Sequence, residues 1–245
     1  MNTKNISILS VAIILAVGIS CLTYLNRYPK SNTGYVEVKG MGQTNFESDL
    51  IVWEGRYKIE RVNLKDAYTA ITSDKNIVEK FLINNGVSTD EIVFGPVSTE
   101  EVFETLYSND GDVIGRRFKT YKLSQDVMIE SKNVSKIDKV SRMITEVLNS
   151  GVRFYSYNPR YYFTDLASLK LDLISKATED ARLRAENIVE KSGANLGYVC
   201  TADMGVLQIV GQNSNESYSW GGTFNTSSRK KTASITIDLK YTVEN

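Results

Sequence analysis

The stretch LASLKLDLISKATEDARLRAENIVEKSGANLG, residues 166–197, carries the pattern that decides the fold. Its small and apolar side chains recur every four residues, so they line one ridge of a long helix over residues 166–191. The ridge consists of Leu169, Leu173, Ala177, Ala181, Ala185 and Val189. Alanines permit close approach, so the ridge predicts packing within the chain, with a contact between subunits as the second interpretation.

A glycine that ends a helix recurs three times. Gly193 follows the long helix, and Gly86 and Gly151 follow two shorter patterns of 3.6-residue period over residues 64–85 and 136–149. Glycine just past a helix accepts the left-handed conformation that turns the chain back. We therefore expect three helices, each leading into a strand.

Capping residues mark the starts of the two shorter helices. Asn63 is expected to cap the helix over residues 64–85, because its side-chain oxygen can accept hydrogen bonds from the first free N–H groups. Ser135 and Asp138 resemble a capping box for the next helix, with Asp in place of the usual Glu.

Alternation of apolar and polar residues between the helices predicts strands. The expected strands cover residues 34–40, 51–60, 92–106, 113–130, 153–164, 196–210 and 232–243. Ser108, Asn109, Asp110 and Gly111 have the chemistry of a hairpin turn. Residues 211–231, rich in Asn, Ser and Gly, predict a long flexible loop. The fold class is therefore α+β: a mainly antiparallel sheet with three helices packed on it, over residues 34–245.

An uncharged run over residues 6–25 precedes this domain. A helix of that length matches the hydrocarbon core of a bilayer, so residues 1–30 predict one N-terminal membrane helix acting as a signal anchor. A signal peptide cleaved near Ala16 or Gly18 and a lipoprotein attached through Cys21 are the alternatives. We expect the domain to lie in the periplasm or otherwise outside the cytoplasm, with the membrane as a partner through this helix.

Composition excludes several classes of function. The 29 basic and 29 acidic residues cancel, whereas nucleic-acid binders usually carry a basic surplus. The chain has no histidine, which removes Ser-His-Asp systems and zinc sites with His ligands. Cys21 and Cys200 are too far apart in the predicted organisation to suggest a disulfide. No catalytic residue, cofactor-binding residue or metal ligand is singled out, and we expect no enzyme.

Two further groups of residues have an open role. The aromatic residues Tyr155, Tyr157, Tyr161 and Phe163 share one parity of a strand, which favours a core or subunit interface over a ligand platform. Short basic clusters are formed by Arg116, Arg117 and Lys119, and by Arg229, Lys230 and Lys231. These clusters favour plain surface charge over binding of an anion or a lipid headgroup.

The long helix resembles that of the SIMPL domain family, which includes periplasmic immunogenic proteins. Its residues 176–189, KATEDARLRAENIV, are similar to the family's alanine-rich helix, and Gly193, Leu196 and Gly197 follow as in the family. The strand VEVKG over residues 36–40 and the turn NGV over residues 85–87 are similar to two further family motifs. The resemblance covers residues 35–243 and implies an extracytoplasmic α+β domain. Some members form ring-like homo-oligomers, some are linked to oxidative-stress defence, and no catalytic residues carry over.

The sequence therefore predicts a non-enzymatic, self-associating cell-envelope protein with a link to stress defence. The alternative is an envelope module that binds a small molecule or lipid through the aromatic strand and the loop over residues 211–231. An apolar pocket already formed beneath that loop would favour this alternative. A serine close to a buried lysine in a cleft would instead indicate an enzyme.

Overall fold

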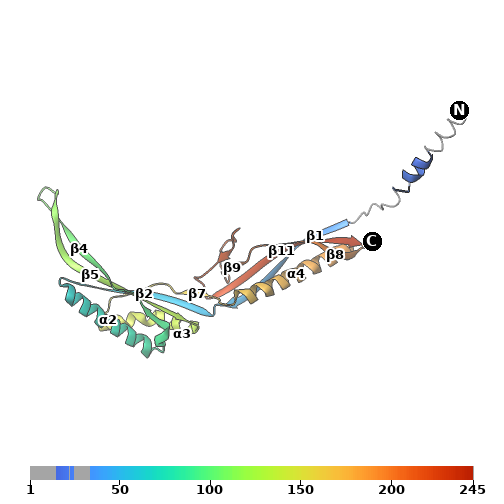
Figure 1. The fold of residues 1–245 in the computed structure, drawn as a ribbon. Coiled ribbons are helices and arrows are strands. Elements are labelled where there is room, and N and C mark those ends of the chain that lie inside the picture. Colours follow the sequence, from blue (N-terminus) through green and yellow to red (C-terminus); the bar gives the residue numbers. More distant parts are fainter. Residues whose placement is uncertain (1–14, 22, 25–33, 245) are drawn as a thin grey trace, which may run out of the picture.

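The computed structural model describes residues 15–21, 23–24 and 34–244. Within them the strands form two sheets, one of five and one of six strands. One sheet carries a single long helix and the other carries two helices, and the two units lie end to end in an elongated molecule (Figure 1). We call them the α4 lobe and the α2–α3 lobe, after their helices.

The α4 lobe joins the two ends of the domain. Strand β1 (Gly34–Glu47) pairs antiparallel with β11 (Lys230–Glu244) along its whole length. The other edge of β11 pairs with β8 (Asn195–Met204) and β9 (Gln208–Gly211), and β10 (Thr223–Phe224) runs parallel to β9. Helix α4 (Leu166–Lys191) lies along β1 and β11 (Figure 1).

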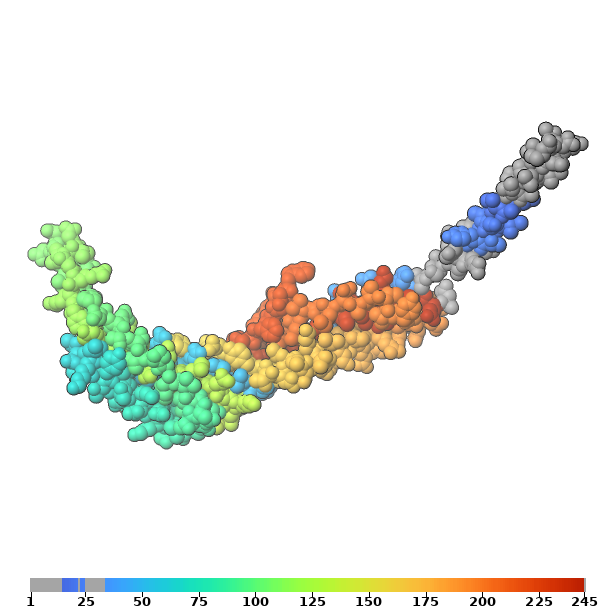
Figure 2. All heavy atoms as spheres, in the orientation of Figure 1, coloured from blue at the N-terminus to red at the C-terminus, as the bar shows by residue number. Residues whose placement is uncertain are grey.

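The α2–α3 lobe is built on the middle of the chain, and all its strand pairs are antiparallel. Its strands are β2 (Leu50–Arg61), β3 (Ile92–Phe94), β4 (Ser98–Tyr107), β5 (Val113–Ser131), β6 (Phe154–Ser156) and β7 (Arg160–Tyr162). Its helical segments are α2 (Leu64–Asn84), α3 (Val134–Met143) and the short 3₁₀ helices η1 (Thr89–Glu91) and η2 (Ile144–Ser150). The ends of β4 and β5 that flank the turn over residues 108–112 project from the lobe as a hairpin, which we call the arm (Figure 2).

Each lobe has its own hydrophobic core. In the α2–α3 lobe, Trp53 and Tyr57 of β2 are fully buried among residues of β5, α2 and α3. In the α4 lobe, alternate residues of β11, such as Ile235 and Leu239, are buried against the alanine ridge of α4. The ridge residues are therefore covered by the sheet of their own chain, which confirms the prediction of packing within the chain.

Several local predictions are confirmed. Helix α4 begins and ends where the ridge pattern predicts, and Asn63 caps α2 by accepting hydrogen bonds from the N–H groups of Lys65 and Asp66. Gly86, Gly151 and Gly193 have φ angles of 82°, 83° and 79°, the left-handed conformation expected after a helix. Cys21 and Cys200 are both free and exposed.

The prediction of one sheet carrying all three helices is wrong. Strands β1 and β2 are separated only by Ser48 and Asp49, but they belong to different sheets. Helices α2 and α3 share a hydrophobic core with one sheet, and α4 shares a core with the other. Periodicity shows which face of a strand is buried but not which strands are neighbours, so it could not reveal the division.

Three expected strands are each split in two. The strand expected over residues 92–106 breaks at Gly95, Pro96 and Val97, and the one over residues 153–164 breaks around Pro159. Proline cannot donate a hydrogen bond to a strand ladder, which accounts for these two breaks. The strand expected over residues 196–210 breaks after Met204, where the chain passes from β8 to β9 along the same edge of β11.

The predicted start and end of the second helix are also wrong. Asn133, not Ser135, caps α3, since its side-chain oxygen accepts a hydrogen bond from Lys136 N. The α-helix ends at Met143 and continues as the 3₁₀ helix η2. Asp138 has another role: it accepts a hydrogen bond of 2.7 Å from Tyr161 Oη and pairs with Arg142.

The predicted N-terminal membrane helix is not supported. Residues 15–21 and 23–24 are helical, and the rest of the segment over residues 6–25 lies outside the described residues. Across the part of the chain that the structure describes, no helix is both long and apolar enough to cross a bilayer.

Candidate ligand-binding site at the junction of the lobes

The segment over residues 211–231 is organised around Glu216 and Asn225. The Glu216 carboxylate accepts a hydrogen bond of 2.9 Å from Gly211 N and another from Asn225 Nδ2. Asn225 Oδ1 in turn accepts one of 2.8 Å from Ser228 N. These bonds hold the pKa of Glu216 below its ordinary value, with the Gly211 amide as the largest cause. The predicted loop thus has defined internal contacts, and its flexibility stays a prediction.

Lys231 is tied into the same network. Its side chain is 2% exposed, and its ammonium donates to the backbone oxygen of Asn225 at 2.5 Å and to Asn225 Oδ1 at 3.2 Å. Burial lowers the pKa of Lys231 to about 8, against the weaker opposing effect of the Glu216 charge. The pKa falls because a charge is costly to maintain in apolar surroundings. Buried groups with shifted pKa values are typical of functional sites.

Lys231 and Asn225 line a cavity of about 150 Å³. The rest of its wall is mainly aromatic and aliphatic: Phe46, Tyr161, Tyr162, Phe163, Leu166, Ile209, Phe224 and Thr226. Strand β7 supplies the tyrosines from the α2–α3 lobe, and Phe163 lies in the segment between β7 and α4. The elements β1, β9, β10 and the start of α4 supply the other apolar residues from the α4 lobe. We call this space the junction cavity, because both lobes contribute to its wall.

The backbone also links the lobes at this point. Tyr161 N donates a hydrogen bond of 2.7 Å to Thr226 O, which joins β7 to the loop that follows β10. The rings of Phe46 and Phe163 meet edge to face with their centroids 4.8 Å apart. These contacts hold the lining residues Tyr161 and Phe163 against the α4 lobe.

The structure separates the four aromatic residues that the sequence grouped together. Tyr161 and Phe163 line the junction cavity, whereas Tyr155 and Tyr157 are exposed on the α2–α3 lobe. The chain leaves the strand after Ser156 and re-enters at Arg160, so the shared parity does not continue across the break. The single aromatic face that the sequence predicts is therefore wrong.

The basic clusters are mostly surface charge, but Arg229 is partly buried, with an Nε that has no hydrogen-bond partner among the described residues, and Lys231 is fully buried. Arg117 pairs with Glu104, Arg229 pairs with Glu47, and the Lys230 side chain is 66% exposed. Lys231 departs from the prediction because it is buried. A signal for this exists in the sequence: Lys231 has the parity of Ala233, Ile235, Ile237 and Leu239, the buried face of β11.

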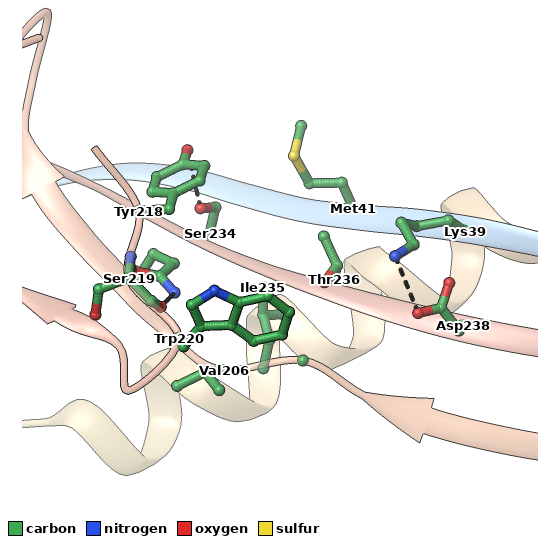
Figure 3. A pocket seen from close by; sticks show the side chains of 12 residues that line it. Lys39, Met41, Val206, Tyr218, Ser219, Trp220, Ser234, Ile235, Thr236 and Asp238 are labelled. Atoms are coloured by element: carbon green, nitrogen blue, oxygen red, sulfur yellow. Dashed lines mark hydrogen bonds and ion pairs between the residues drawn. The ribbon is translucent and has the colours of Figure 1, made fainter. Parts of the chain in front are cut away.

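A second depression lies on the opposite side of the same loop, over the face of the sheet away from α4. It has a volume of about 410 Å³. Figure 3 shows the exposed indole of Trp220 beside Val206, with the Lys39–Asp238 ion pair farther along the sheet. Tyr218 Oη lies 3.2 Å from Ser234 Oγ at the other end. Its polar groups largely bind one another, so it is less suited than the junction cavity to select a ligand.

The arrangement that would indicate an enzyme is not found at Lys231. Among the described lysines Lys231 alone is buried, and its hydrogen bonds go to Asn225 rather than to a serine hydroxyl. The expectation of a protein without catalytic activity stays a prediction.

The comparison with protein families agrees with the resemblance seen in the sequence. The model of the SIMPL family, described as a protein of unknown function (DUF541), matches residues 36–244. This range includes both lobes, the arm and every residue that lines the junction cavity. No curated protein matches the chain. The chain belongs to the SIMPL domain family.

Proposed function

We propose that this chain is a non-enzymatic cell-envelope protein that binds a small, largely apolar molecule in the junction cavity. The observation that carries the proposal is the meeting of Tyr161 and Phe163 with Phe224 around one cavity beneath the loop. A volume of about 150 Å³ is in the range that takes a single aromatic ring, since apolar cavities of this size bind benzene. The proposal takes up the alternative that the sequence left open.

Ligand-observed NMR with benzyl alcohol tests this function. The natural protein should show saturable binding of the ring, and Leu166→Phe should abolish it by placing a larger side chain in the cavity wall. Leu171→Phe is the matched control, because Leu171 is exposed on α4. Saturable binding that Leu166→Phe leaves unchanged would assign the ring to another place and refute the proposal.

A second proposal is self-association through the arm. Tyr107, Val113 and Ile114 are 62%, 64% and 65% exposed near its end, where no other part of the described chain covers them. Apolar side chains gathered on a projecting hairpin often mark an interface. The alanine ridge no longer supports self-association, because α4 buries it within the chain.

Sedimentation velocity of the full chain tests the arm. We expect an oligomer that a double substitution, Val113→Ser with Ile114→Ser, shifts towards the monomer. Leu171→Ser removes an equally exposed apolar side chain elsewhere and should leave the distribution unchanged. An oligomer unaffected by the double substitution would exclude the arm as the interface.

The cellular location is also a proposal. The family resemblance supports a domain outside the cytoplasm. Proteinase added to spheroplasts should digest the domain, while a cytoplasmic marker protein stays intact. Full protection of the domain under those conditions would place it in the cytoplasm instead.

A further inference from the structure

We propose that the ligand of the junction cavity is a small monocarboxylate with an apolar body, whose carboxylate pairs with the ammonium of Lys231. This inference names the chemical class of the ligand and rests on the proposed function of the cavity. It comes from the contrast between an almost wholly apolar wall and a single buried cation within it.

The first step concerns the partners of the ammonium. A lysine ammonium carries three N–H donors. Asn225 accepts two of them, through its backbone oxygen and through Oδ1. Both acceptors are neutral, and among the described residues no carboxylate lies within hydrogen-bond distance of Lys231 Nζ. One donor and the positive charge are therefore left for an anionic partner.

The second step concerns the other charged and titratable groups around Lys231. Asn225 lies between Glu216 and Lys231: the Glu216 carboxylate bonds to Asn225 Nδ2 rather than to the ammonium. Tyr161 and Tyr162 line the same cavity, and burial raises the pKa of Tyr161 to about 12, so its hydroxyl stays neutral near pH 7. No other anion in the described wall competes for Lys231.

The third step concerns size and polarity. Apart from Tyr161, Tyr162 and Thr226, the remaining wall is apolar. Its side chains, such as Phe46, Leu166 and Ile209, offer contact but no hydrogen bond. A ligand that fills about 150 Å³ against such a wall needs an apolar body of about one ring or a short branched chain. A carboxylate at one end of that body would meet Lys231, and the desolvated pair would be stronger than the same pair in water.

The lowered pKa of Lys231 is consistent with this placement. Burial lowers the pKa to about 8 even against the weaker opposing effect of the Glu216 charge, and a bound carboxylate in direct contact would raise the pKa again. Binding therefore favours the charged lysine, so the affinity for a carboxylate should fall as the pH rises above about 8. A neutral ligand of the same shape should show no such fall.

Calorimetric titration of the full chain with benzoate and with benzyl alcohol, at pH 6.5 and pH 9.5, separates the two proposals. At pH 6.5 we expect the affinity for benzoate to exceed that for benzyl alcohol by about tenfold or more. At pH 9.5 the affinity for benzoate should be lower by about tenfold or more. Lys231→Met should abolish this preference while retaining benzyl alcohol. Lys230→Met, which removes an exposed charge on the next residue, should behave as the natural protein.

The outcomes distinguish the inference from the function on which it rests. Binding of benzyl alcohol without a preference for benzoate would overturn the carboxylate inference and leave the cavity proposal standing. Binding of neither compound would overturn both. Tight benzoate binding without pH dependence, or equal binding by Lys231→Met, would assign the anion to another cation. The pH series on the natural protein decides the question even if Lys231→Met fails to fold.

Discussion

A methyl group placed on Gly40 would lie 2.1 Å from the carbonyl oxygen of Ala177. Two residues further along the strand, a methyl group on Gly42 would lie 2.0 Å from the carbonyl oxygen of Leu173. Strand β1 and helix α4 therefore approach each other backbone to backbone, with glycine on the strand facing alanine on the helix. This close approach explains why the ridge of α4 carries alanines where it crosses β1.

Gly40→Ala should destabilise the protein strongly. The added methyl group must displace the backbone of α4 or β1, and overpacking of this kind typically costs about 1–3 kcal/mol, with the upper end expected here because backbone atoms are in the way. Urea unfolding followed by far-ultraviolet circular dichroism measures the loss. Gly34→Ala in the same strand is the control, since its methyl group would meet no atom closer than 3.5 Å. Equal effects of the two substitutions would contradict the close approach.

The stability of the protein should rise between about pH 8 and pH 10 because of Lys231. Its pKa is lowered to about 8 in the folded state from 10.5, so the unfolded chain binds more protons in this window and folding gains as the pH rises. The contribution is on the order of 1–3 kcal/mol. Unfolding free energies measured at several pH values should show this slope in the natural protein and not in Lys231→Met. A parallel slope in both proteins would contradict the lowered pKa.

Glu216→Ala should loosen the segment between β9 and β11. The substitution removes the acceptors of Gly211 N and Asn225 Nδ2, so hydrogen exchange at Gly211 and Ser228 should become faster, while exchange in α2 stays unchanged. The same loosening should appear in the natural protein as the pH falls below 4.5, since the lowered pKa of Glu216 makes its contribution present above that value and lost on protonation. Rapid exchange already present in the natural protein at neutral pH would instead support the flexible loop that the sequence predicts.

The two tryptophans should report on opposite environments. Trp53 is fully buried and donates through Nε1 to Ser156 Oγ at 3.0 Å, whereas Trp220 is fully exposed at the open depression. Acrylamide should therefore quench part of the emission readily and part of it poorly. In Trp220→Phe, only the shielded, blue-shifted emission of Trp53 should remain. Strong quenching of the emission that remains would show that Trp53 is accessible.

Much of the secondary structure could be predicted from the sequence, because it depends on neighbours in the chain. The four-residue spacing of the ridge set the bounds of α4, and Gly86, Gly151 and Gly193 marked the turns that follow the helical segments. The hairpin turn also agrees, since Gly111 has a φ angle of 90° and its N–H bonds to Ser108 O. Family membership followed from the same local patterns.

The junction cavity was only half visible in the sequence. The loop and the aromatic strand were singled out, and Tyr161, Phe163 and Phe224 do meet there. Lys231 was assigned to surface charge because it follows Arg229 and Lys230, and charge clusters are usually solvated. Its strand parity pointed inwards, but a lysine on a buried face becomes credible only when an acceptor such as Asn225 is known to lie beside it.

By itself, the sequence determined the helices, their glycine ends, most strands and the family. The tertiary structure alone decided that Ser48 and Asp49 separate two sheets, that Gly40 lies against Ala177, and that Lys231 lies inside a cavity shared by both lobes. The physical reason is the range of the interactions. Helix ends and turns depend on hydrogen bonds between residues close in the chain, whereas strand neighbours and cavities depend on contacts between segments far apart in it.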